Sequence, residues 1–401
     1  MAQRVFVTGI GVITANGFNV AEVTNSLKGL RTGISTLSLF DSVYQDEIPV
    51  AEIKASNSEL LDLAGPGQRG TYSRTALLGL IAARQAVAHA RLEKTSDLRT
   101  GLISATTVGG MDRSEVFYRS YLEKNTSGRI RYVAGHDCGD STEKIADCLG
   151  IRGFLSTINT ACSSSANSIM LGARLIKQGK LDRVIAGGVD ALTLFTLNGF
   201  NSLMILDRQQ CRPFDENRNG LNLGEGSGFL VLESEEVVNR EGKAVLCEIK
   251  GYGNTCDAYH QTASSPEGHG AYLSMRKALE VAQLSAEDID YINTHGTGTK
   301  NNDLSEGVAI ERVFQAGIPP CSSTKSYTGH TLGAAGAIEA VFSIIALQHG
   351  WIYPNLNFIH PMHELSFTPV TEFKTGMVLH NIMSNSFGFG GNNSTLIFSR
   401  Y

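Results

Sequence analysis

Residues 160–166 read Thr-Ala-Cys-Ser-Ser-Ser-Ala and lie where a strand pattern runs directly into a helix pattern. Residues 154–159 alternate as a half-buried strand does. After the stretch, apolar residues recur at helical spacing: Ala166, Ile169, Met170, Ala173 and Ile176. Cys162 therefore stands at a helix start, where unpaired N–H groups and the helix dipole favour a thiolate. We expect Cys162 to be a nucleophile, with a small buried core cysteine as the alternative.

The composition is that of a globular protein. The 401 residues are 42% hydrophobic and 18% charged, which predicts a large core and two domain-sized units. The formal net charge of −5 argues against nucleic acid or an anionic membrane as the main partner. No apolar run approaches the roughly 20 residues that span a bilayer, and we expect a cytoplasmic protein without a signal peptide. Seven cysteines without Cys-x-x-Cys or zinc-finger spacing are expected to be reduced thiols that hold no metal.

Strand and helix patterns alternate along the whole chain, which predicts an α/β fold. The order of elements in residues 1–240 recurs in residues 241–401, so we expect two related halves. In the second half, His330 stands at the strand-to-helix junction that corresponds to that of Cys162. The duplication therefore predicts one site with Cys162 on one side and His330 on the other.

Three stretches of the second half follow expected strand ends and are not explained by packing. Residues 293–299 contain His295, residues 324–330 contain Lys325 and His330, and residues 388–391 read Gly-Phe-Gly-Gly. Each stretch alone has a structural interpretation, but their shared placement favours one common site. A cysteine with a histidine base suggests acyl transfer through a thioester. Two imidazole N–H groups would also stabilise an enolate, which indicates Claisen condensation.

Four motifs resemble those of the β-ketoacyl-acyl carrier protein synthases, specifically the elongating type II branch. They are Thr-Ala-Cys-Ser-Ser at 160–164, Thr-His-Gly-Thr-Gly-Thr at 294–299, Ser-Thr-Lys-Ser-Tyr-Thr-Gly-His-Thr-Leu-Gly-Ala-Ala-Gly at 323–336, and Asn-Ser-Phe-Gly-Phe-Gly-Gly-Asn-Asn at 385–393. The resemblance covers residues 5–398 and implies the thiolase fold, a duplicated five-layer αβαβα arrangement. It also implies a dimer, homo- or heteromeric, and an acyltransferase of fatty acid or polyketide-like biosynthesis. Acyl carrier protein would be the partner and no cofactor would be needed, because the substrates travel on its phosphopantetheine arm.

The resemblance assigns roles to individual residues. Cys162 would take the acyl chain from acyl carrier protein as a thioester. The backbone N–H groups of Cys162 and Phe389 would form the oxyanion hole, and the Phe389 side chain would act as a gate. His295 and His330 would polarise the malonyl thioester, promote loss of carbon dioxide and stabilise the enolate.

The resemblance also implies a supporting set around the histidines. Lys325, held by Glu306 with Asp303 nearby, would keep the histidine pair oriented and correctly protonated. Thr297 and Thr299 would bind the pantetheine arm by hydrogen bonds.

The sequence departs from the family pattern in several places. Residues 127–138 replace the proline- and phenylalanine-bearing stretch that lines the acyl tunnel in housekeeping enzymes, which leaves chain length open. Residues 390–393 read Gly-Gly-Asn-Asn for the usual Gly-Gly-Thr-Asn, and residues 162–165 read Cys-Ser-Ser-Ser for Cys-Thr-Ser-Gly. These departures indicate a specialised synthase, for example of an aryl-polyene or other polyketide-like pathway, with housekeeping elongation as the alternative. The basic residues expected to dock the carrier protein are Arg69 and Arg74, assisted by Arg113, Arg119, Arg129 or Arg131.

Two other classes share the implied fold. A noncatalytic chain-length partner subunit normally lacks the cysteine, whereas Cys162 is present. A coenzyme A-dependent thiolase brings a second catalytic cysteine in a glycine-rich C-terminal motif, and residues 386–393 contain none. The condensing synthase is therefore the favoured interpretation.

Overall fold

The computed structural model describes residues 3–65, 71–92, 98–315 and 317–401. Within these residues ten strands form one mixed sheet, in the order β3-β2-β4-β5-β1-β6-β10-β9-β7-β8. The strands are β1 (Val5–Thr14), β2 (Thr100–Ala105), β3 (Leu155–Ile158), β4 (Arg183–Asp190), β5 (Gly226–Ser234), β6 (Cys247–Cys256), β7 (Tyr291–Asn293), β8 (Cys321–Ser322), β9 (Asn381–Phe387) and β10 (Asn392–Ser399). The helices are α1 (Val20–Lys28), α2 (Asn57–Ala64), α3 (Arg74–His89), α4 (Met111–Glu123), α5 (Cys138–Leu149), α6 (Ser164–Lys177), α7 (Leu194–Ser202), α8 (Glu235–Glu241), α9 (His269–Ala282), α10 (Lys300–Phe314), α11 (Lys325–Thr328) and α12 (Ala335–His349).

The two halves of the sheet have the same strand arrangement. β3-β2-β4-β5-β1 forms the first half and β8-β7-β9-β10-β6 the second, so the strand five places later in sequence takes the equivalent position. Strand directions repeat as well, because β2 is parallel to β3 and β4 just as β7 is parallel to β8 and β9. β5 is antiparallel to β1 and β4, and β10 is antiparallel to β6 and β9. The repeated element order expected from the sequence is thus present in the topology.

A short seam joins the two half-sheets. β1 and β6 pair only at Phe6 with Glu248 and at Val7 with Cys247, whereas β1 pairs with β5 along its whole length. Sheet hydrogen bonds therefore contribute little to the relative position of the halves, which must depend on the helices packed between them.

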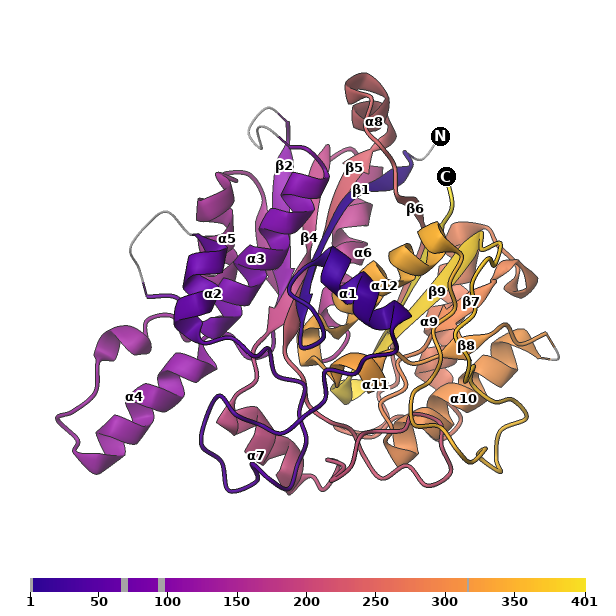
Figure 1. The fold of residues 1–401 in the computed structure, drawn as a ribbon. Helices are drawn as coiled ribbons and strands as arrows, with labels where there is room; N and C mark the ends of the chain where they lie inside the picture. Colours follow the sequence, from indigo (N-terminus) through magenta and orange to yellow (C-terminus); the bar gives the residue numbers. More distant parts are fainter. Residues whose placement is uncertain (1–2, 66–70, 93–97, 316) are drawn as a thin grey trace.

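The helices complete five layers (Figure 1). α3 and α5 cover the outer face of the first half-sheet, α9 and α10 cover the outer face of the second, and α6 and α12 lie between the two. α6 and α12 approach closely near their first turns, where a Cβ added to Gly336 would come within 2.9 Å of the Ala166 Cβ. The helices that follow Cys162 and His330 thus form the central layer, and the expected duplicated αβαβα arrangement is confirmed.

α12 is buried along almost its whole length. Its first 13 residues are buried, and they pack in one apolar cluster with α6 and with strands of both halves. Within the described chain, the stretch Leu332–His349 has the length and apolar character to cross a membrane, and 89% of it is buried inside the protein. Burial in the core accounts for this composition.

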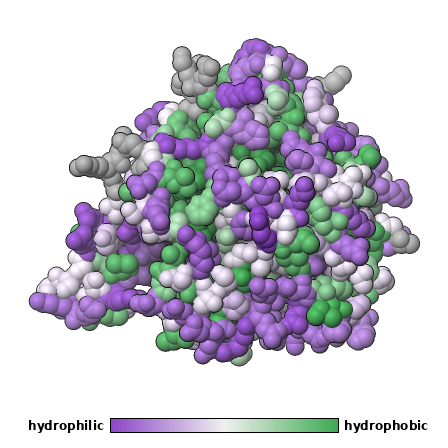
Figure 2. Space-filling view, in the orientation of Figure 1, coloured by the Kyte–Doolittle hydropathy of each residue, from purple (hydrophilic) through white to green (hydrophobic). Residues whose placement is uncertain are grey.

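The strand and helix patterns of the sequence do not mark five of these elements, namely β9, α2, α4, α7 and α8. β9 lacks the apolar pattern expected of a buried strand, because polar side chains on it are buried, among them Asn385. α4 has no buried residue and extends away from the body of the molecule (Figure 1). Large exposed apolar side chains on it include Val116, Tyr118 and Leu122. On the face drawn in Figure 2, apolar residues form scattered patches between hydrophilic ones.

Candidate active site

One cavity of about 430 Å³ collects the residues that the sequence singled out. Its walls include Cys162, Phe389, His295, His330, Thr297 and Thr299. Cys162 comes from the first half and the others from the second, so the site lies between the halves. No residue of 127–138 is among the residues that line this cavity.

Cys162 occupies a tight bend between β3 and α6. The preceding residue, Ala161, has a positive φ of 53°, and the helix begins two residues after Cys162, at Ser164. Burial raises the pKa of the Cys162 thiol to about 11, while the backbone N–H of Phe389, the charge of Lys325 and its own backbone N–H act in the opposite direction. The expectation of a thiol pKa lowered by the helix start is therefore wrong, because enclosure in the core outweighs the local donors.

The glycine-rich turn before β10 lies directly against this bend. A Cβ on Gly388 would stand 3.0 Å from the carbonyl oxygen of Thr160 and 3.1 Å from the backbone nitrogen of Cys162. The next residue, Phe389, stacks on Phe200 of α7 with ring centroids 5.8 Å apart. The turn thus brings a backbone N–H to the thiol and places an aromatic ring in the cavity wall.

The two histidines face each other edge to face, with ring centroids 5.3 Å apart and an interplanar angle of 85°. Both are buried, and burial lowers the pKa of each imidazole well below 6.5, with the charge of Lys325 adding to the effect. Both rings are therefore neutral at pH 7, and each carries one N–H. Nδ1 of His330 has no hydrogen-bond partner in the described protein.

Lys325 contacts the His295 ring and determines which of its two nitrogens carries the proton. Its ammonium donates to His295 Nδ1 at 3.2 Å and forms an ion pair with Glu339 of α12. Because Nδ1 accepts this bond, the proton of the neutral ring is on Nε2. The expected partner of Lys325 was Glu306, and this expectation is wrong. Burial raises the pKa of Glu339 to about 7, with the neighbouring ammonium acting in the opposite direction.

Glu306 and Asp303 instead hold the backbone of the loop that carries His295. Glu306 accepts from the N–H of His295 at 2.9 Å and of Gly296 at 2.8 Å, and burial raises its pKa to about 7. Asp303 accepts from the N–H of Thr297 at 2.9 Å and of Gly298 at 3.1 Å. Both carboxyl groups sit on α10, so this helix shapes the loop after β7.

Thr297 and Thr299 stand at the wall of the same cavity. Their hydroxyl oxygens are 2.9 Å apart and can exchange a hydrogen bond. They are therefore available together as donors and acceptors for a polar chain that enters the cavity.

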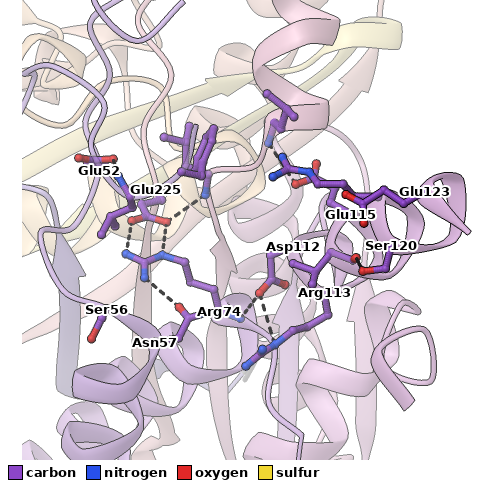
Figure 3. Close-up of a pocket in the computed structure, with 16 residues that line it drawn as sticks. Glu52, Ser56, Asn57, Arg74, Asp112, Arg113, Glu115, Ser120, Glu123 and Glu225 are labelled. Carbon is purple, nitrogen blue, oxygen red and sulfur yellow. Dashed lines mark hydrogen bonds and ion pairs between the residues drawn. The ribbon is translucent and has the colours of Figure 1, made fainter. Parts of the chain in front are cut away.

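Arg74 lies in a second cavity of about 420 Å³, shown in Figure 3. Its guanidinium donates to both carboxylate oxygens of Glu225, at 2.6 and 2.8 Å, and is buried. The expectation that Arg74 docks a carrier protein is therefore wrong, because its charge is already satisfied inside the protein. Arg69 lies outside the described residues, Arg113 is half-buried, and the remaining candidates are exposed: Arg119, Arg129 and Arg131.

The sequence interpretation missed Glu339. It is a charged residue in a helix whose first 13 residues are buried, and an isolated charge in such a run is the signal that could have identified it. Within the described ranges, no group of three His, Cys, Asp or Glu side chains is arranged to hold a metal ion.

Comparisons with known proteins agree with this geometry. Residues 2–237 match the family model for the N-terminal domain of β-ketoacyl synthases, and residues 246–359 match the model for the C-terminal domain. The chain belongs to the β-ketoacyl synthase family. This synthase is 34% identical to 3-oxoacyl-[acyl-carrier-protein] synthase 2 of Staphylococcus aureus strain COL, over 100% of this chain and 99% of the relative.

Solved ketosynthases have the same fold as this synthase. It superposes on the ishigamide ketosynthase/chain length factor with a TM-score of 0.92 and 31% identity, covering 100% of both chains. For the ketosynthase (ApeO) in complex with its chain length factor (ApeC) from Xenorhabdus doucetiae, the TM-score is 0.84 and the identity 31%, covering 100% and 98%. The family, the thiolase-type fold and the condensing acyltransferase class implied by the motifs are thereby confirmed.

Proposed function

We propose that this synthase joins a Cys162-bound acyl chain to a malonyl unit by decarboxylative Claisen condensation, as a 3-oxoacyl-acyl carrier protein synthase. The observation that carries the proposal is the cavity in which a buried thiol and two neutral histidines meet. A thiol supplies the nucleophile, and two imidazole N–H groups supply the donors for an enolate oxygen.

In the first half-reaction, Cys162 Sγ adds to the carbonyl carbon of an acyl thioester. The N–H groups of Cys162 and Phe389 hold the oxygen as it gains charge. The carbon–sulfur bond to the carrier then breaks, and the thiol proton leaves with the released pantetheine sulfur. Since burial raises the thiol pKa, the proton departs only as the new bond forms.

In the second half-reaction, the malonyl thioester oxygen accepts hydrogen bonds from Nε2 of His295 and from the His330 imidazole. The bond to the carboxylate breaks, carbon dioxide leaves and an enolate remains. Its carbon attacks the acyl carbonyl on Cys162, and the cysteine sulfur leaves as a thiolate that takes up a proton. Lys325 keeps the His295 proton on Nε2, while Glu306 and Asp303 keep the loop in place.

The proposal includes the assembly around this chemistry. Substrates arrive on the phosphopantetheine arm of acyl carrier protein, bound along Thr297 and Thr299, so no resident cofactor is required. The relatives described as ketosynthase with chain length factor support a dimer, either of two copies or with a related subunit. We place the division between the Cys162 half and the histidine half at residues 240 and 241, and the enzyme in the cytoplasm. Its pathway is fatty acid or polyketide-like synthesis, including the aryl-polyene type.

Two alternatives remain distinguishable by experiment. Purified protein is incubated with acyl and malonyl acyl carrier protein, and carbon dioxide, 3-ketoacyl product and the intact mass of the enzyme are measured. The proposal expects a thioester adduct on Cys162 and no product from Cys162→Ala. A thiolase would use coenzyme A thioesters equally well, and a noncatalytic partner subunit would show no mass shift. Full condensing activity in Cys162→Ala would overturn the assignment.

A further inference from the structure

Three asparagines from different elements meet beside the nucleophile. Oδ1 of Asn392, at the start of β10, accepts from Asn254 Nδ2 of β6 at 2.8 Å and from Asn167 Nδ2 of α6 at 3.0 Å. The Ser163 hydroxyl also lies 2.8 Å from this oxygen and 2.8 Å from the main-chain oxygen of Thr160, so its single proton is shared between the two acceptors. Ser163 is fully buried and follows Cys162 directly in sequence. One side-chain oxygen thus connects the helix that follows the thiol to β6 and β10, the two strands of the second half nearest the seam.

The cluster is closed by a second set of bonds. Oδ1 of Asn167 accepts from Ser394 at 2.8 Å and from Asn254 at 3.1 Å, while its Nδ2 donates to the Thr160 hydroxyl at 2.9 Å. The Asn167 amide therefore fits the site in only one orientation, since its oxygen faces donors and its nitrogen faces acceptors.

The same Asn392 closes the turn that carries Phe389. Its main-chain oxygen accepts from the N–H of Gly388 at 2.9 Å, and the N–H of Gly391 donates to the Gly388 oxygen at 3.1 Å. Gly390 and Gly391 have φ values of 79° and 77°, which glycine adopts readily. Two more main-chain bonds hold this turn, from the Gly390 N–H to the Gln261 oxygen at 2.7 Å and from the Asp257 N–H to the Gly391 oxygen at 2.9 Å. The Asn392 side chain thus links this turn by hydrogen bonds to Ser163 and Asn167, which follow Cys162 in the chain.

We propose that Asn392 is a positioning residue that sets the oxyanion hole, by clamping the Phe389 turn to the start of α6. In this role it acts through the two backbone N–H groups of Cys162 and Phe389, and its own side-chain oxygen is bound to Ser163, Asn167 and Asn254. The inference rests on the proposed function, because it concerns the oxygen of the acyl thioester that these groups would hold.

The test compares Asn392→Ala with Asn381→Ala as a matched control. Asn381 lies at the far end of β9 and also bonds through both amide atoms, to Asp288 and Ser399. Acylation of Cys162 is followed by intact mass with an acyl N-acetylcysteamine thioester, well below the unfolding temperature of each variant. We expect Asn392→Ala to slow acylation about 10–100-fold, because misplacing an oxyanion donor costs less than removing it. We expect Asn381→Ala to acylate at the wild-type rate.

Two further readouts separate positioning from a general loss of structure. Release of carbon dioxide from malonyl carrier protein depends on the histidines and should be unchanged in Asn392→Ala. Alkylation of Cys162 by iodoacetamide should slow, because the Phe389 N–H favours the thiolate. Asn254→Ala removes one hydrogen bond to Asn392 Oδ1 at an exposed position, so it should slow acylation less than Asn392→Ala does. This variant provides the test if Asn392→Ala does not fold.

The outcomes are distinct. Equal acylation rates in Asn392→Ala and Asn381→Ala would overturn the inference and leave the condensing function intact. Slowed acylation together with equally slowed decarboxylation would also overturn it, since that indicates a general disturbance of the site. If the wild-type enzyme forms no adduct on Cys162, the proposed function itself fails.

Discussion

Replacing Lys325 with methionine tests the buried charge that supports the histidine pair. Methionine is of similar length but uncharged, so Glu339 loses its partner and His295 Nδ1 loses its donor. Burial already raises the pKa of Glu339 from 4.5 to about 7 beside the ammonium. Keeping that carboxylate ionised therefore already costs the wild-type protein about 3 kcal/mol at neutral pH, and removing its ionic partner destabilises the folded state beyond this. We expect the free energy of unfolding to fall by about 3–5 kcal/mol.

The loss of stability should depend on pH. Without Lys325 the pKa of Glu339 rises further, and a carboxyl with a raised folded-state pKa destabilises the folded chain above its unfolded pKa of 4.5. This destabilisation is relieved as the pH falls through the folded-state pKa and Glu339 takes up a proton. Denaturant unfolding at pH 8 and at pH 5.5 should therefore show the larger loss at pH 8.

A double variant separates stability from chemistry. Lys325→Met with Glu339→Leu removes both charges, and an apolar pair of similar volume should recover most of the stability. Condensing activity should stay low, because nothing then holds the His295 proton on Nε2. Equal unfolding energies for Lys325→Met and the wild type at pH 8 would refute the buried-pair argument. Full activity in the double variant would refute the role assigned to the Lys325–His295 bond.

Three other changes have defined outcomes. Gly388→Ala places a Cβ 3.1 Å from the Cys162 nitrogen and should slow acylation about tenfold with the fold retained, as intact mass and thermal unfolding would show. His295→Ala should reduce carbon dioxide release about 10²–10³-fold, while Cys162 is still acylated. An equal loss in both assays would contradict the assignment of decarboxylation to the histidines and of acylation to Cys162. Arg74→Met should lower the free energy of unfolding by about 3–5 kcal/mol through the unpaired Glu225. Its KM for carrier protein should stay at the wild-type value, whereas a raised KM would restore Arg74 as a docking residue.

The sequence predicts the site best where the periodicity of apolar residues changes over a short stretch. The junctions at Cys162 and His330 stand out because strand periodicity changes to helix periodicity within a few residues. The topology then repeats over both halves because each half must bury the same kind of sheet between helical layers. The placement of these two residues in one cavity followed from that repeat.

What the sequence could not show depends on tertiary burial. The partner of Lys325 is Glu339, fourteen residues away on another helix, and no spacing rule distinguishes it from Glu306. The pKa of Cys162 is raised by enclosure that local motifs do not report. β9 was missed because Asn385 is buried to bind Glu306 and Thr395, which contradicts the rule that buried strands are apolar.

The close approach of α6 and α12 limits which positions of this enzyme tolerate larger side chains. A larger side chain at Ala166 or Gly336 would push the two helix starts apart, and the nucleophile away from the histidines with them. The cavity walls contributed by α7 and by residues 203–205 belong to neither of these two helices, and Phe200 of α7 is the residue among them that stacks on Phe389. Protein engineers seeking a different product should therefore exchange these wall segments between related synthases and leave the central pair intact. New substrate ranges can then be built on the scaffold without readjusting its chemistry.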